Sequence, residues 1–274
     1  MFEAVFEQAS LLKKLVEAIK ELTDTACFEV TSTGISCQAM DTSHVSLVTF
    51  VLKGAQLAHF RCDRSLTLGL NLKTLTKLLK TAGNEDKCTL KAEEDGDRLT
   101  IMIEAKNGSK TSSYEIKMMD ITQDSLGVSD AEYKAVLKMN SEEFMRICRD
   151  MSLIGDTVQI EMNKEAVSFT VTGEETSGTV TLRPSTPVDD DAGTSIEIQE
   201  PLNLSFALRF LNFFTKASPL SEKVTVSLSP DQPLCVSYDI GDMGNIRYFL
   251  APKIEDEASA TAGSSSSSSS ESAE

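Results

Sequence analysis

The sequence predicts an α+β fold in which one domain plan occurs twice. The chain has 274 residues and is 41% hydrophobic, with short apolar runs along its length, which is enough for one large core or two modest ones. Segments that alternate apolar and polar residues outnumber segments with helical spacing, which favours antiparallel sheets with a few helices. A repeat at one fixed offset then indicates that the plan is duplicated.

The repeat appears in two separate segments at an offset of 132 residues. It aligns apolar, basic and amide positions: Leu12, Leu15, Val16 and Ile19 with Phe144, Ile147, Cys148 and Met151; Lys14 with Arg146; Asn71-Leu72 with Asn203-Leu204; Lys77 with Arg209; and Leu78-Leu79 with Phe210-Leu211. We therefore expect homologous domains at 1–117 and 135–257, a connecting loop at 118–134 and a tail at 258–274.

Each half is expected to begin with an amphipathic helix, at Ser10–Glu21 and at Ser141–Leu153. Apolar residues recur at i, i+3, i+4 and i+7 in both, and a serine suits the N-cap. A second, shorter helix is expected at Leu72–Lys80 and at Ser205–Lys216.

Strands occupy most of the remaining chain. Cys27–Val30 and Val167–Val171 alternate between apolar and polar residues, as half-buried strands do. Asp95-Gly96 and Asn107-Gly108 are typical of hairpin turns. The duplicated order of few helices and many antiparallel strands gives the α+β class.

The ends of the chain and its cysteines indicate an intracellular protein. No basic stretch leads into an apolar one at the N-terminus, and no apolar run is long enough to span a membrane. The tail, ASATAGSSSSSSSESAE, has no large apolar residue to bury, so we expect it to be disordered. Six cysteines without a CxxC pair favour free, mostly buried thiols.

Residues for catalysis or metal binding are few. The only histidines are His44 and His59, and no nucleotide-binding, zinc-protease or hydrolase motif is present. Glu93-Glu94-Asp95 and Asp189-Asp190-Asp191 lie in polar, turn-like segments, where solvated charge is the commoner explanation. We expect no enzyme activity, no metal and no cofactor.

The charge distribution reverses what the total suggests. A formal net charge of −16 should repel a polyphosphate. The four predicted helices, however, contain five acidic residues and ten of the 26 basic ones: Lys13, Lys14, Lys20, Lys73, Lys77, Lys80, Arg146, Arg149, Arg209 and Lys216. Basic residues spaced by four or seven share a helix face, which predicts a surface that binds duplex phosphates without reading sequence.

Long stretches of the chain resemble the eukaryotic DNA sliding clamp family. They extend over about 1–257 and include LKKLVEAIKEL, MDTSHVSLV, FRCDR, KTAGNED, FMRICRDMS, FALRFLNFFTKASPLS and DMGNIRYFLAPKIEDE. The resemblance implies a closed homotrimeric ring with helices inside and sheets outside. It further implies a nuclear processivity factor that encircles double-stranded DNA and recruits replication and repair proteins.

The resemblance assigns a DNA-facing set to the helices. Its members are Lys13, Lys14, Lys20, Lys77, Lys80, Arg146, Arg149, Arg209 and Lys216. Leu153 departs from the pattern, because many relatives have a polar or basic residue there. We therefore expect a slightly weaker positive field at that helix end.

The resemblance also implies a hydrophobic cleft for a peptide carried by DNA polymerase, flap nuclease, ligase and other partners. The peptide has the form Gln-x-x-aliphatic-x-x-aromatic-aromatic, and aromatic anchors would fill an apolar pocket. The lining residues are Met40, His44, Val45, Leu47, Leu126, Val128, Tyr133, Ala207, Pro233, Phe249, Ala251 and Pro252. Phe249 stands where relatives usually have tyrosine, so a hydroxyl is lost.

Two further sets follow from the resemblance. Lys164, in a predicted hairpin turn, matches a lysine that accepts ubiquitin or a related modifier and so recruits translesion polymerases. The ring would pair a strand near Lys110–Lys117 with one near Thr176–Arg183 of the next subunit. The contributors are Leu78, Thr81, Lys110, Tyr114, Ile116, Thr179 and Leu182. A clamp loader is a further implied partner.

Three alternatives stay open at this point. The chain could be one subunit of a heterotrimeric checkpoint clamp, which has the same fold with different neighbours. It could be an acidic chaperone or scaffold that does not encircle DNA, although this leaves the basic helices unexplained. It could also be an enzyme with an unrecognised carboxylate site, which the shortage of histidine disfavours.

Overall fold

The computed structural model describes residues 1–94, 96–121, 132–185 and 193–253. The first half contains two helices and nine strands in this order: β1 (Phe2–Phe6), α1 (Ala9–Ile19), β2 (Thr25–Thr31), β3 (Gly34–Met40), β4 (Ser46–Lys53), the 3-10 turn η1 (Gly54–Gln56), β5 (His59–Cys62), β6 (Leu66–Asn71), α2 (Leu72–Leu79), β7 (Lys87–Ala92), β8 (Arg98–Glu104) and β9 (Thr111–Lys117).

The second half repeats the order of the first. Its elements are β10 (Ala135–Asn140), α3 (Ser141–Met151), β11 (Thr157–Met162), β12 (Val167–Thr172), β13 (Ser177–Leu182), β14 (Ser195–Ile198), β15 (Leu202–Ala207), α4 (Leu208–Phe214), η2 (Thr215–Leu220), β16 (Lys223–Ser229), β17 (Gln232–Asp239), η3 (Gly241–Met243) and β18 (Gly244–Leu250). The duplicated α+β plan is confirmed.

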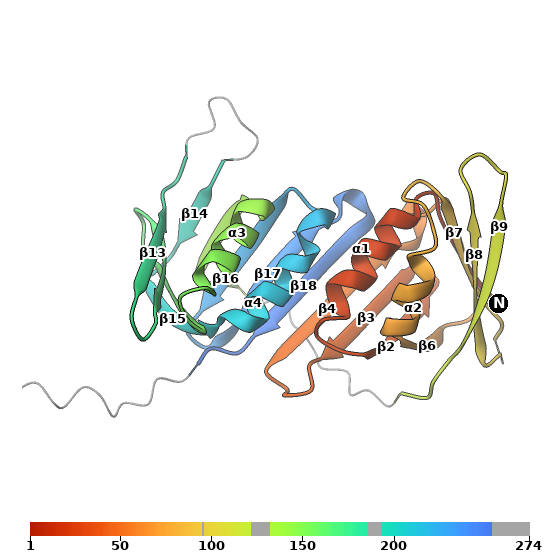
Figure 1. Cartoon of the computed structure of the whole chain (residues 1–274), viewed down its shortest axis with the longest axis horizontal. Coiled ribbons are helices and arrows are strands. Elements are labelled where there is room, and N and C mark those ends of the chain that lie inside the picture. The colour runs from red at the N-terminus through yellow and green to blue at the C-terminus, as the bar shows by residue number, and fades with distance from the viewer. Residues whose placement is uncertain (95, 122–131, 186–192, 254–274) are drawn as a thin grey trace, which may run out of the picture.

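The strands form three antiparallel sheets, and the strand orders of these sheets reflect the duplication. The five-stranded sheet runs β5-β1-β7-β8-β9, and the four-stranded sheet runs β13-β12-β11-β15. The nine-stranded sheet, β14-β10-β16-β17-β18-β4-β3-β2-β6, contains the counterpart of each, joined where β18 pairs with β4. This pairing makes the two halves one continuous structure, and β9 and β13 lie at opposite ends of it (Figure 1).

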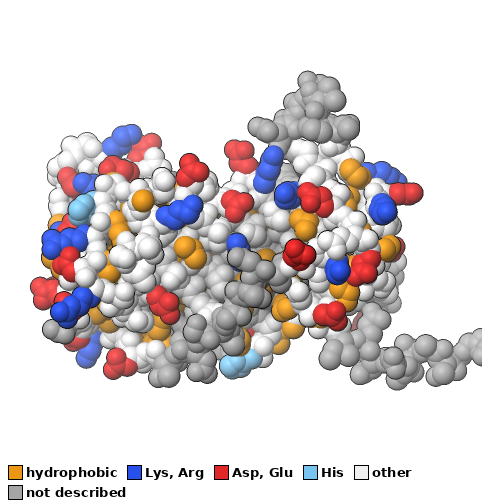
Figure 2. All heavy atoms as spheres, turned by 180° about the vertical axis from the view of Figure 1, so that it is seen from behind, with side chains coloured by type: hydrophobic (Ala, Val, Ile, Leu, Met, Phe, Trp, Pro, Cys, Tyr) orange, Lys and Arg blue, Asp and Glu red, His pale blue; other side chains and the backbone are white. Residues whose placement is uncertain are grey.

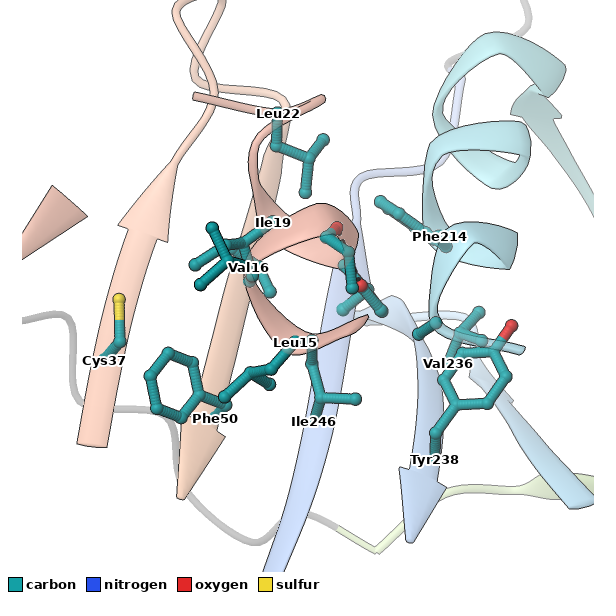
Figure 3. Packing of buried hydrophobic residues seen from close by; sticks show 14 of the residues in the cluster. Leu15, Val16, Ile19, Leu22, Cys37, Phe50, Phe214, Val236, Tyr238 and Ile246 are labelled. Carbon is teal, nitrogen blue, oxygen red and sulfur yellow. Dashed lines mark hydrogen bonds between the residues drawn. The ribbon is translucent and has the colours of Figure 1, made fainter. Parts of the chain in front are cut away.

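All four helices lie on one face of the sheets (Figure 1). Helix α1 packs its apolar side chains over the joint between the halves, where Leu15 and Val16 lie among Phe50 of β4 and Ile246 of β18 (Figure 3). These side chains are at most 1% exposed. The core is therefore shared across the joint.

The repeat does not keep one offset. Helices α1 and α3 begin 132 residues apart, but α2 begins at Leu72 and α4 at Leu208. The predicted start of the fourth helix was wrong, because Ser205–Ala207 completes strand β15. The connection from β13 to β14 is longer than that from β4 to β5, which moves the later elements to an offset of 136. Arg209 is thus the counterpart of Lys73, not of Lys77.

Asparagines cap α2 and α3, whereas the sequence predicted serine caps for α1 and α3. The Asn140 side chain accepts the Glu142 and Glu143 N–H groups, and that of Asn71 accepts the Thr74 N–H at 2.9 Å. The N-cap of α1 is Gln8, whose side chain makes no capping bond. The predicted Ser10 and Ser141 caps were wrong, since both residues lie inside their helices. Ser141 instead donates its buried hydroxyl to the Ser221 carbonyl.

The predicted strands are confirmed in β2 and β12, and the turn at Asn107-Gly108 is confirmed as well. Gly108 has a φ of +68°, and the Asn107 side chain accepts the Ser109 N–H at 3.0 Å. Asp95 and the tail lie outside the described residues. The domain limits stay a prediction, with β9 ending at Lys117 and β10 beginning at Ala135.

All six cysteines are free thiols, and five of them are buried. Cys62 is partly exposed and donates its thiol to the Arg64 carbonyl at 3.0 Å. No helix in the described part of the chain is long and apolar enough to cross a membrane.

Candidate nucleic-acid face and partner surfaces

The predicted DNA-facing residues lie on the helix side of the molecule or at the ends of the helices. Lys20 and Lys80 are the C-cap residues of α1 and α2, and Lys216 lies in η2. Most of the set is exposed, namely Lys14, Lys77, Lys80, Arg146, Arg149, Arg209 and Lys216. Lys13 and Lys20 are half-buried. The helices therefore present a basic surface, though not an even one.

Three lysines of α1 are held by bonds within the chain. Lys13 donates its ammonium to the Ala82 carbonyl, which fastens α1 to the segment after α2. Lys14 donates to the Pro219 carbonyl at 3.0 Å, across the joint between the halves. Lys20 lies 3.8 Å from a carboxylate oxygen of Glu21. These bonds limit how freely the three charges can meet a phosphate.

Helix α3 is not net basic. Its first turn contains Glu142 and Glu143, and Arg149 forms a 2.9 Å ion pair with Asp150. The two acidic residues are favourable at a helix N-terminus because its dipole is positive there. The basic face predicted for the helices is therefore uneven. Within the DNA-facing set, the residues whose side chains form no ion pair or hydrogen bond with another described residue are Lys77, Lys80, Arg146, Arg209 and Lys216.

Two apolar side chains interrupt this face at α3. Leu153, just beyond the helix, is 83% exposed, and Met145 is 38% exposed. A solvent-facing leucine supplies neither charge nor hydrogen bonds to a phosphate. The weaker positive field at this end of α3 stays a prediction.

The opposite face of the central sheet bears a row of apolar side chains that cross the joint. In the strand register Met40 faces Leu47, Leu47 faces Phe249, and Phe249 faces Cys235. Four strands from both halves thus bring together three of the predicted pocket residues. Figure 2 shows this side of the molecule, where acidic and basic side chains are interspersed and hydrophobic ones lie between them.

A tight loop beside this row is built on Asp41, which the sequence did not single out. Its carboxylate accepts the N–H groups of Ser43, Val45 and Ser46 at 2.6 to 2.9 Å. Burial by itself would raise the pKa of Asp41, but these bonds and the Ser43 hydroxyl outweigh it and hold the pKa below its usual value. The loop exposes Val45 and sets His44 at a φ of +57°.

Tyr133 joins the row from the connecting segment. Its hydroxyl forms a hydrogen bond with the Cys235 thiol, and burial raises the pKa of Cys235 to about 11. Burial likewise raises the pKa of Tyr133. The sequence did not mark Cys235, because a lone cysteine gives no signal of what will cover it.

Most other described members of the predicted pocket set lie on β17, on the Asp41 loop or just after β18, whereas Ala207 ends β15 of the four-stranded sheet. Ala251 donates its N–H to the Val45 carbonyl at 3.1 Å, which draws the C-terminal segment to the Asp41 loop. Pro233 and Ala251 are exposed, whereas Ala207 and Pro252 are half-buried. Leu126 and Val128 lie outside the described residues. The described members other than Ala207 therefore lie on or beside the middle strands of the central sheet.

Lys164 lies in the hairpin between β11 and β12, as predicted, and it is exposed. The Asn163 side chain accepts the N–H groups of Glu165 and Ala166 at 2.9 Å. The turn therefore presents the lysine on a rigid base.

The predicted subunit-contact residues lie on and beside β9 and β13, the free edges of the outer sheets. Tyr114 and Leu182 are half-buried, Ile116 is buried, and Thr179 and Lys110 are exposed. Leu78 of α2 and Thr81 stand next to β9. Hydrogen bonds with the Thr81 and Ser112 side chains hold the pKa of Tyr114 below its usual value.

The acidic clusters noted in the sequence are described only in part. Glu94 is paired with Arg64, while Asp95 and Asp189–Asp191 lie outside the described residues. Within the described ranges no three His, Cys, Asp or Glu side chains are grouped as metal ligands would be.

Family models match both halves of the chain. The model of the N-terminal domain of proliferating cell nuclear antigen matches residues 1–126, and that of its C-terminal domain matches residues 127–253. The chain belongs to the proliferating cell nuclear antigen family. This membership supports a DNA sliding clamp that acts in replication and repair as a scaffold rather than as an enzyme. In the order of the sequence, the two matched domains correspond to the two halves of the fold.

Proposed function

We propose that this chain is a homotrimeric sliding clamp that encircles duplex DNA in the nucleus and raises polymerase processivity. The observation that carries the proposal is the placement of two free strand edges, β9 and β13, at opposite ends of a duplicated fold. Their counterparts, β18 and β4, pair with each other inside the chain. A contact between two different surfaces, here β9 of one copy and β13 of the next, closes into a ring when the rotation from copy to copy adds up to a full turn.

The counterpart residues can be assigned because hydrogen bonds repeat. Met119 donates its N–H to Gly69 at 2.9 Å, and Lys253 donates to Ser205 at 2.8 Å, which matches β9 to β18. Asp41 donates to Ser46 at 3.0 Å, and Gly173 donates to Thr176 at 2.8 Å, which matches β4 to β13.

This assignment predicts the register between subunits. Inside the chain, Tyr248 faces Val48. The counterpart pair is Tyr114 and Gly178 of the next subunit, with Ser112 facing Val180 and Lys110 facing Leu182. Pairing would also cover two edges that otherwise invite uncontrolled association.

The hole of such a ring would be lined by the helices. Lys77, Lys80, Arg149, Arg209 and Lys216 are exposed there and can attract the phosphates of either strand. Duplex DNA carries one charge per about 1.7 Å of axis, so a loose attraction changes little as the ring moves along it. Topology, not tight contact, would hold the ring on DNA.

The row of Met40, Leu47, Phe249 and Cys235 supports the peptide site on the outer face. An apolar anchor of a polymerase, flap nuclease or ligase peptide would lie on this row, and the Asp41 loop would fix its register. We include a clamp loader as a partner, and Lys164 as the acceptor of ubiquitin or a related modifier for translesion synthesis.

The test is light scattering on a size-exclusion column, followed by a charge reversal. The wild-type chain alone should elute at three times its 29.8 kDa mass. A chain that stays monomeric until two different subunits are added would support a checkpoint clamp instead. Lys77→Glu with Arg149→Glu should keep the trimer and reduce polymerase stimulation. Unchanged stimulation would contradict the assignment of the helix face.

A further inference from the structure

Two polar side chains tie the halves together across the joint inside the chain. Lys14 of α1 donates to the Pro219 carbonyl at 3.0 Å, and the Tyr248 hydroxyl of β18 donates to the Ala18 carbonyl of α1 at 3.0 Å. Tyr248 also stacks on Phe214, with ring centroids 4.6 Å apart. Each bond links one half to the other over the core shown in Figure 3.

The repeat gives every partner of these bonds a counterpart at the free ends. Lys14 corresponds to Arg146, and Ala18 corresponds to Asp150, because α1 and α3 begin 132 residues apart. Tyr248 corresponds to Tyr114 by the match of β18 to β9.

Pro219 corresponds to Gly83, because the start of α2 is as far from the start of β7 as the start of α4 is from the start of β16. The hydrogen bonds at their ends agree. Ala9 donates its N–H to the Asp86 carbonyl at 2.7 Å, and Ser141 donates to that of Glu222 at 2.9 Å.

We propose that these two hydrogen bonds recur between subunits. Arg146 donates its guanidinium to the Gly83 carbonyl of the next subunit, and the Tyr114 hydroxyl of that next subunit donates to the Asp150 carbonyl of the first. The proposal rests on the homotrimer proposed above. It moves Arg146 from the DNA-facing set to the subunit junction.

The groups involved are available in the single chain. Arg146 is exposed, and no hydrogen bond or ion pair to another described residue is seen for it. The Gly83 carbonyl accepts only the Asp86 N–H among described residues, at a long 3.4 Å. The Asp150 carbonyl is met by the N–H groups of Ser152 and Leu153, the latter at 3.2 Å, but it lacks its usual helical donor because the Ile154 N–H goes to Met151.

Tyr114 is less buried than its counterpart Tyr248, as expected for a residue at a junction that is open in the single chain. Tyr248 is fully buried, whereas Tyr114 is only half-buried and shares hydrogen bonds with the Thr81 and Ser112 side chains. The counterpart of Thr81 is Ala217, which has no hydroxyl. Thr81 thus gives the Tyr114 hydroxyl a hydrogen-bond partner while the edge is open, and the Asp150 carbonyl accepts the hydrogen bond of that hydroxyl when the ring closes.

The experiment measures trimer dissociation on dilution for Arg146→Ala, Arg146→Lys and Arg149→Ala. Loss of one such hydrogen bond should weaken each junction about fivefold. Because a trimer has three junctions, half-dissociation should then occur at about tenfold higher concentration. Arg146→Lys should behave as wild type, since a lysine makes the same bond at Lys14. Arg149→Ala should keep the trimer and lose DNA affinity.

The outcomes separate the two proposals. A wild-type chain that never forms a trimer overturns the proposed function. Suppose instead that the wild type is a trimer and that Arg146→Ala dissociates at the same concentration as the wild type. If this variant also loses DNA affinity as Arg149→Ala does, Arg146 faces DNA and the inference is wrong. Tyr114→Phe gives an independent measurement, and it should also dissociate at higher concentration because the ring remains and only the hydroxyl is lost.

Discussion

Tyr248→Phe should destabilise the chain, whereas Tyr238→Phe should not. Both tyrosines are fully buried on neighbouring strands, and their rings meet edge to face at 6.3 Å. The Tyr248 hydroxyl donates to the Ala18 carbonyl at 3.0 Å. The Tyr238 hydroxyl makes no hydrogen bond of normal geometry to a described residue, and its nearest polar neighbour, the Ser218 hydroxyl, donates to the Ser141 carbonyl at 3.2 Å. The pair isolates one hydrogen bond in a matched setting.

The magnitude follows from what each substitution leaves behind. Removing the Tyr248 hydroxyl loses the bond and strands the Ala18 carbonyl in an apolar environment, which should cost about 2 kcal/mol of the free energy of unfolding. Removing the Tyr238 hydroxyl strands nothing and relieves an unpaired buried group. Its effect should lie between zero and about 1 kcal/mol of stabilisation.

Urea unfolding at one fixed subunit concentration measures both, because the stability of an oligomer depends on concentration. With an m-value of about 3 kcal/mol/M, Tyr248→Phe should lower the midpoint by about 0.7 M at unchanged slope. The midpoint of Tyr238→Phe should stay or rise. Equal losses for the two variants would refute the reasoning, since the cost would then come from ring packing and not from the bond to Ala18.

Three further predictions concern other parts of the molecule. Asp41→Ala should cost about 3 kcal/mol by leaving three N–H groups of the loop unpaired. Because its folded pKa is depressed, the stability Asp41 contributes is present above its usual value of 3.8 and is lost as the pH falls through the folded pKa, which acid unfolding of the variant and wild type would show. Burial raises the pKa of Cys88 to about 12 and of Cys235 to about 11. The stability that these two thiols contribute should therefore be fully present below pH 9 and be lost as the pH rises toward 11 to 12. Cys235→Ala should flatten this alkaline fall in the free energy of unfolding, measured by urea titration. Leu153→Lys should strengthen DNA binding and steepen its salt dependence by about 0.9 per site engaged, and an unchanged slope would place residue 153 away from DNA.

Periodicity recovered the class of the fold because the pattern of burial is local. The apolar residues of α1 and α3 repeat at helical spacing, and the strands β2 and β12 alternate, so both could be predicted from a short window. The caps could not, because asparagine and serine are both good N-caps and only the path of the preceding strand decides between Asn140 and Ser141.

The sequence could indicate which residue types belong to the candidate surfaces, but not the hydrogen bonds that hold their side chains. Residue type identified Lys13 and Lys14 as cations, but their bonds to Ala82 and Pro219 depend on segments 69 and 205 residues away. Cys235 was missed for the same reason, because it contacts Tyr133 of the connecting segment. Asp41 was missed although its partners are local, because residue type does not distinguish an aspartate that accepts three N–H groups of its own loop from a solvated one.

The comparison of counterparts also indicates where a ring of these chains would open. Inside the chain Phe214 is buried at the joint, and Leu11 and Leu220 pack against the core there. Their counterparts at the free ends are Leu78, Glu143 and Asn84, which are smaller or polar. In the proposed ring Tyr114 would face Gly178, where inside the chain Tyr248 faces Val48. Burial of apolar area is the main source of association energy, so the contact between subunits should be weaker than the joint within one. A ring that must open to admit DNA would therefore part between subunits, and each two-domain chain would move as one body.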